Sequence, residues 1–190
     1  MSKKTRIYKE CFNYLRKLKN YFYIIIIIFL FAMFLGYFFP YPLEDELRKI
    51  IEKLIEETKG MNIFELAIFI ISNNITTSFI ALIFGILIGI VPIIMNFFNG
   101  YFLGFVLSKS IDVFGYQVIM RLFPHGIFEL PAFFISIALG LKLGMFIFTK
   151  NKKSYLAENL EKSLKIFIYI IIPLLIIAGI IETILIFFIK

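Results

Sequence analysis

The sequence predicts an all-α membrane protein: a bundle of about five transmembrane helices with one amphipathic helix outside it. Hydrophobic residues make up 61% of the 190 residues and the mean hydropathy is +0.92, whereas soluble domains are about 45–50% apolar. A helix rises about 1.5 Å per residue and the hydrocarbon layer is about 30 Å thick, so a span needs about 20 apolar residues. The polar linkers are too short for a catalytic domain, and we expect a single membrane domain over residues 1–190.

The predicted spans follow from the hydrophobic stretches taken in order along the chain. The first and the last are long enough to cross a bilayer easily. The second and third are short and adjoin, which indicates a helical hairpin whose first helix has room to extend back through residues 64–72. The five stretches are residues 21–39, 75–90, 91–107, 127–148 and 166–189.

The distribution of charge predicts the orientation. Lysine and arginine are concentrated in residues 1–20 and 149–165, which the positive-inside rule places in the cytoplasm. Residues 41–62 mix acidic with basic side chains and suit the opposite face. Five spans then run from a cytoplasmic amino terminus to an external carboxyl terminus in the cell membrane. The net charge of +7 flanks the spans, so nucleic acid is not an expected partner, whereas the lipid bilayer is.

Two linkers carry apolar residues at helical spacing. In residues 41–62 the apolar positions fall on one face and the acids on the other, which predicts an external amphipathic helix. Those positions are Leu43, Leu47, Ile50, Ile51, Leu54 and Ile55. In the basic linker 149–165 and just beyond it, Leu156, Leu160, Leu164 and Phe167 share a face, as in a cytoplasmic interfacial helix.

Small residues recur four positions apart within three neighbouring spans. The pairs are Gly85 with Gly89, Gly100 with Gly104, and Gly140 with Gly144. Because lipid provides no hydrophobic drive for helix association, such Gly-xxx-Gly pairs let backbones approach closely. We interpret these glycines, together with Asn99, as helix-packing residues of a tight bundle, and a pore-lining role is the alternative.

The fourth span is preceded by the most informative local segment, residues 121–131. On a helix, His125 and Glu129 lie one turn apart on the same face. Pro131 removes an amide hydrogen, so a kink or a broken start to the helix is expected. Counting inward from the outer ends places Glu129 and Glu182 at similar depths, about 5–10 Å into the membrane.

These residues predict a polar cluster in the outer leaflet, because a charge at that depth is costly unless it is paired or hydrated. The proposed members are Asn74, His125, Glu129 and Glu182, with Arg121 as a counter-charge. Two interpretations stay open. The cluster is either a set of hydrogen bonds that fixes the bundle or a site for a proton, an ion or a small solute.

The sequence argues against an enzyme. His125 is the only histidine and Cys11 the only cysteine, which leaves a zinc enzyme short of ligands. No HExxH, GxSxG or phosphate-binding glycine loop is present. His125 and Glu129 could form an acid–base pair but have no recognisable nucleophile. We therefore expect no catalytic residue, no metal and no cofactor.

Several of these residues together resemble the stage II sporulation protein M family over residues 64–148. The most specific part is the His-Gly-x-x-Glu-Leu-Pro segment. The resemblance is carried by Asn73-Asn74, Gly85, Gly89, Asn99-Gly100, Gly104, Pro124-His125-Gly126, Glu129-Leu-Pro131-Ala132 and Gly140-Leu-Lys-Leu-Gly144. It implies an integral membrane protein whose namesake, in spore-forming bacteria, works with a peptidoglycan-cleaving partner and another membrane protein. It implies no catalytic residues.

Two classes of function follow. The first is a non-enzymatic membrane component that assembles or recruits partners, either a second copy of itself or other membrane proteins. The second is a transporter or channel subunit that uses the polar cluster, for which buried ionisable groups and Pro- or Gly-interrupted spans are typical. Five spans in a short chain favour the first, unless the protein forms a homodimer.

Overall fold

The computed structural model describes residues 3–188, apart from the side chains of residues 3–4, 114, 118 and 120–122. Within that part the chain is helical except for short connections and contains no strand, which confirms the all-α prediction. The α-helices are α1 (Lys3–Arg16), α2 (Lys19–Phe38), α3 (Glu44–Thr58), α4 (Ile63–Ile83), α5 (Ile90–Phe114), α6 (Gln117–Gly144), α7 (Lys152–Ile166) and α8 (Ile172–Phe188). Three 3-10 turns, Tyr41–Leu43, Phe84–Ile86 and Met145–Phe148, and one π-helical segment, Phe167–Ile171, connect some of them.

Five helical segments are long and apolar enough to cross a membrane, as predicted. They are Lys19–Phe38, Ile63–Ile86, Ile90–Val113, Phe123–Phe148 and Lys152–Phe188. The shortest has 20 residues, which at about 1.5 Å per residue matches the thickness of the hydrocarbon layer. The chain is therefore a membrane protein with several spans.

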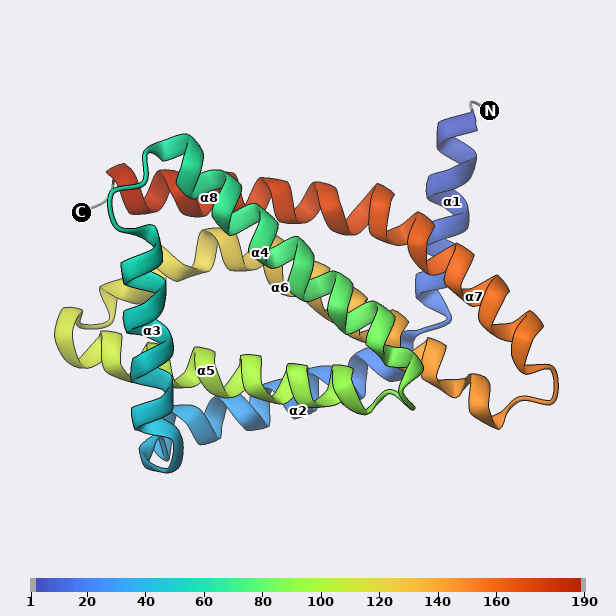
Figure 1. Cartoon of the computed structure of the whole chain (residues 1–190), viewed down its shortest axis with the longest axis horizontal. Helices are drawn as coiled ribbons and strands as arrows, with labels where there is room; N and C mark the ends of the chain where they lie inside the picture. Colours follow the sequence, from blue (N-terminus) through green and yellow to red (C-terminus); the bar gives the residue numbers. More distant parts are fainter. Residues whose placement is uncertain (1–2, 189–190) are drawn as a thin grey trace.

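α6 lies in the middle of the bundle (Figure 1). α2 and α5 run side by side and contact α6 from one side, while α4 and α8 pack on it from the other. α3 crosses one end of the bundle, and α1 and α7 lie at the opposite end. We call these the α3 end and the α7 end.

The hairpin predicted from the second and third stretches is present, but both of its helices are longer than predicted. α4 begins at Ile63 because Asn62 and Glu65 form a capping box: Asn62 Oδ1 accepts from the amides of Phe64 and Glu65, and Glu65 accepts from the Asn62 amide. The turn ends at Gly89, whose φ of 70° suits glycine. The structure thus shows the extension back through residues 64–72 for which the sequence left room.

The expected break at Pro131 does not occur. α6 is a continuous helix from Gln117 to Gly144 with Pro124 and Pro131 inside it, and it begins ten residues before the predicted span. A proline removes one backbone hydrogen bond, and neighbouring helices in a membrane bundle commonly compensate for it. The prediction of a broken or re-entrant start was wrong.

The core centres on the second half of α6. Ala132, Ile137, Ala138, Leu139 and Leu143 are each fully buried. They pack with residues of α2, α4 and the π-helical segment in the main core cluster. A smaller cluster of Ala32, Leu47, Tyr101 and Phe105 joins α3 to α2 and α5. The centre of α6 is thus held from every side.

The basic amino-terminal segment is more ordered than its charge suggests. It forms α1, and Cys11 and Leu18 are 4% and 0% exposed in the main core cluster. The ring of Tyr8 meets that of Tyr169 edge to face at 6.2 Å. α1 is therefore packed onto the helix that ends in α8. The basic charge pattern of this segment gave no indication of that packing.

Candidate functional site

α6 and α8 bring His125, Glu129 and Glu182 together at the α3 end. Each contributes one potential ligand atom, and these atoms all lie within 4.8 Å of one another. His125 and Glu129 face the same way because they are one helical turn apart, and Glu182 comes from the packed neighbour α8. All three side chains are partly buried. We call them the HEE cluster.

A partly open cavity of about 600 Å³ adjoins the HEE cluster. α3, α4, α6 and α8 line it, and Glu129 and Glu182 form part of its wall. Its other polar wall residues are Thr58, Asn73 and Asn74, and the remainder is apolar, including Leu54 and Ile70. The cavity is large enough for several water molecules beside the carboxylates.

No lysine or arginine among the described residues pairs with the two carboxylates of the HEE cluster. The six ion pairs of the described part all lie on α1, on α7, or on α3 and its contact with α5. The predicted counter-charge, Arg121, has its side chain outside the described residues. Asn74 lines the same cavity as the acids. Of the predicted members of the polar cluster, the structure brings His125, Glu129 and Glu182 together and places Asn74 on the wall of the cavity beside the two acids.

α3 is fixed across its end of the bundle by one apolar and one polar contact. Leu47 is 5% exposed in the smaller core cluster. Glu44 Oε1 accepts from Lys109 Nζ of α5 at 2.9 Å and from Arg48 Nη2 at 2.7 Å. These hydrogen bonds from Lys109 and Arg48 lower the pKa of Glu44 below its ordinary value. The carboxylate that anchors α3 therefore stays ionised at neutral pH.

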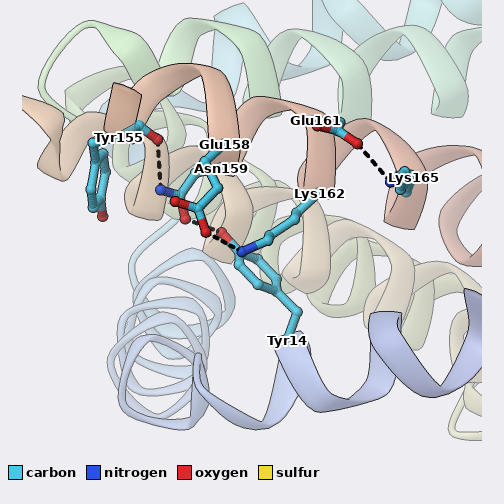
Figure 2. A network of polar contacts seen from close by, with 7 residues as sticks. All are labelled: Tyr14, Tyr155, Glu158, Asn159, Glu161, Lys162 and Lys165. Carbon is cyan, nitrogen blue, oxygen red and sulfur yellow. Dashed lines mark hydrogen bonds and ion pairs between the residues drawn. The ribbon is translucent and has the colours of Figure 1, made fainter. Parts of the chain in front are cut away.

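A network of polar contacts joins α1 to α7 at the other end (Figure 2). The Tyr14 hydroxyl donates to Asn159 Oδ1 at 2.6 Å, and Asn159 Nδ2 donates to the Tyr155 carbonyl at 2.7 Å. Lys162 pairs with Glu158 and lies over the Tyr14 ring at 5.7 Å. The Tyr14–Asn159 bond is buried, so it fixes how α1 sits on α7.

The predicted packing glycines lie at backbone contacts between helices. A Cβ on Gly85 would be 2.1 Å from the Gly140 carbonyl oxygen, and one on Gly104 would be 2.0 Å from the Met33 carbonyl oxygen. A Cβ on Gly100 or on Gly144 would lie 2.5 Å from a backbone atom of Phe29 or Gly89, respectively. The exception is Gly89, where the nearest atom would be the end of the Leu141 side chain at 2.9 Å. Most of these glycines thus permit close backbone contacts between helices.

Asn99 differs from the glycines grouped with it. Its side chain is exposed, and its amide donates to the Met95 carbonyl of its own helix. The buried asparagine is Asn96, 1% exposed, whose Nδ2 donates to the Ile25 carbonyl of α2 at 2.9 Å. Gly36 was also missed: its Cβ would be 2.0 Å from the Tyr101 carbonyl oxygen. The spacing of Ala32 and Gly36 was the signal that could have revealed it.

The helices and the HEE cluster define a class: an integral membrane protein with several spans, close glycine-mediated packing and an acidic cluster near one end. The chain belongs to the stage II sporulation protein M family, whose model matches residues 25–185. The family match covers all five apolar segments at least in part. It confirms the family that the glycines and the His125 segment indicated.

A more specific comparison is with an uncharacterised protein of Methanocaldococcus jannaschii. The two sequences are 32% identical over 120 residues, which is 60% of this chain and 66% of that protein. No solved structure matches the chain significantly. That relative has no assigned activity.

Proposed function

We propose that this protein is a non-enzymatic membrane component that assembles with another membrane protein through α3. The observation that carries the proposal is that specific contacts hold α3 across one end of the bundle. It is attached to the bundle through Glu44 and Leu47, and Arg48 holds the Glu44 carboxylate in place. Most of its other side chains are exposed. If α3 contacted nothing beyond its own bundle, this anchor would have no evident role. We therefore infer that the exposed face of α3 contacts a second protein.

The chemistry of the exposed α3 side chains indicates the kind of partner. The five apolar segments present mainly apolar side chains, which lipid covers without specificity. α3 instead exposes charged groups, and residues 44–59 contain six acidic and four basic side chains. An acidic surface selects a complementary basic one and suppresses like-charged partners. We therefore infer a partner with a basic segment next to its own span.

Photo-crosslinking tests this assignment. A photoreactive amino acid at Glu52 or Glu56, both exposed on α3, should capture one reproducible partner in native membranes. The same group at Lys153, on α7, should not capture that partner. Adding Lys49→Glu should preserve or increase the yield, and replacing Glu56 by lysine beside the probe at Glu52 should reduce it at least tenfold. A yield insensitive to these charges, or no capture from α3 in a well-expressed host, would contradict the proposal.

The proposed orientation places the amino terminus and α7 in the cytoplasm and α3 outside. It rests on the concentration of lysine and arginine in residues 1–20 and 149–165. The transporter or channel alternative gains no support from the comparisons. The role in assembly needs α3 to be accessible to a partner from outside the cytoplasm.

Cysteine labelling in intact cells checks the orientation. In a Cys11→Ser background, Lys53→Cys on α3 should react with a membrane-impermeant maleimide, whereas Lys153→Cys on α7 should react only after permeabilisation. Both lysines are exposed, so access across the membrane decides the result. The reverse pattern would invert the topology and would place α3 in the cytoplasm.

A further inference from the structure

We propose that the HEE cluster binds a divalent transition-metal ion of the zinc or manganese class and thereby links α6 to α8. The site would use one imidazole nitrogen from His125 and one carboxylate oxygen each from Glu129 and Glu182. This inference does not depend on the role assigned to α3, because the three ligand residues lie on α6 and α8.

The geometry is close to that of a three-ligand metal site. Zinc binds nitrogen and carboxylate oxygen at about 2.0–2.2 Å in a tetrahedral arrangement, so two ligand atoms of one ion lie about 3.3–3.6 Å apart. The three ligand atoms here lie within 4.8 Å of one another. We infer that rotation of these three side chains closes the remaining gap when an ion binds.

The donor set indicates the class of ion. Imidazole suits zinc, iron and nickel, whereas carboxylates also suit manganese and magnesium. One nitrogen and two oxygens therefore favour a first-row divalent ion over magnesium or calcium, which take oxygen ligands. The single histidine, which argues against the usual zinc-enzyme ligand sets, is compatible with this more oxygen-rich site.

The charge of the cluster also favours a cation. Glu129 and Glu182 lie close together and partly buried, with no lysine or arginine partner among the described residues. Two such carboxylates repel each other at membrane depth, and a divalent ion would neutralise both at once. A proton shared between them is the competing arrangement, which the experiment below distinguishes.

The cavity supplies access and the remaining ligands. It opens beside Glu129 and Glu182, with the amides of Asn73 and Asn74 on the same wall. A volume of about 600 Å³ leaves room for water to complete the coordination sphere of the ion. Amide groups beside bound water are the kind of outer partner that orients metal ligands.

Calorimetric titration of the full chain with metal tests the proposal. The protein must carry no polyhistidine tag, because the tag would itself bind the metal. His125, the only histidine of the chain, is then the only imidazole available to the ion. We expect saturable binding of one Zn²⁺ or Mn²⁺ per chain after treatment with a chelator, not displaced by a tenfold excess of Mg²⁺. Glu129→Gln and Glu182→Gln should each weaken binding at least tenfold, and the double variant should abolish it. Glu56→Gln, the same change on exposed α3, should leave it unchanged.

Two further measurements separate loss of the site from loss of the fold. Without metal, the double variant should unfold at the same temperature as the native protein or at a higher one, because a repulsion is removed. If that variant does not fold, the visible spectrum of native protein loaded with Co²⁺ decides, since it should show a protein-bound ion whose bands change in His125→Gln. Absence of saturable Zn²⁺ and Mn²⁺ binding, or equal binding by a folded double variant, would overturn the proposal.

Discussion

Replacing Gly140 by alanine is expected to lower the free energy of unfolding by about 1–3 kcal/mol, the range for overpacking a tight core. The added Cβ would lie 2.4 Å from the Ala81 carbonyl oxygen and 3.0 Å from Pro92 Cγ. A backbone oxygen cannot rotate away as a flexible side chain can, so α4 and α6 must separate. Reversible unfolding in mixed detergent micelles measures the loss.

The matched control is Gly126→Ala on the same helix. No atom of the described residues lies within 4 Å of the Cβ that this change adds. Alanine is also the better helix former, by up to about 1 kcal/mol. The control should therefore be neutral or stabilising. If the two variants lost equal stability, close contact between α4 and α6 would not be the cause.

Shortening Ile137 to alanine is the second large effect that we expect, at about 1–3 kcal/mol. Ile137 is fully buried at the centre of α6, and deleting three carbons from a tight core leaves a cavity. Lipid is as apolar as the protein core, so the transfer contribution is small and lost packing dominates. The expected loss of unfolding free energy is therefore smaller than the range for soluble proteins. The same micelle assay measures it.

Ile127→Ala provides the comparison, because Ile127 is 51% exposed on the same helix. Its truncation removes side-chain contacts that lipid can replace, and a change within about 0.5 kcal/mol is expected. A loss at Ile127 as large as that at Ile137 would show that burial in the core is not the cause, because alanine is the better helix former at both positions.

Much of the fold could be predicted because the bilayer constrains it. Spans must be helical and about 20 residues long, so the five segments follow from composition alone. The approach of His125 and Glu129 is set by one helical turn. Glu182 was placed near them by its depth, which is a property of a membrane protein and would have meant little in a soluble one.

What could not be predicted depends on contacts between distant segments. Asn96 is buried because the Ile25 carbonyl, 71 residues away, accepts its hydrogen bond. Tyr14 in α1 is buried against α7, where its hydroxyl donates to Asn159, 145 residues away. α6 starts early despite Pro124 and Pro131, which local hydropathy and proline rules count against a helix. In each case packing overrides the local pattern.

The continuous helix from Lys152 to Phe188 has a mechanical consequence. Its 37 residues correspond to about 55 Å at 1.5 Å per residue, nearly twice the hydrocarbon thickness. Every residue along it is helical, the π-helical turn included. One uninterrupted helix therefore links the contact between Tyr14 and Asn159 at one end of the bundle to Glu182 at the other. The helix changes direction between α7 and α8 (Figure 1), where the π-helical segment Phe167–Ile171 lies, and such segments are where helices commonly bend.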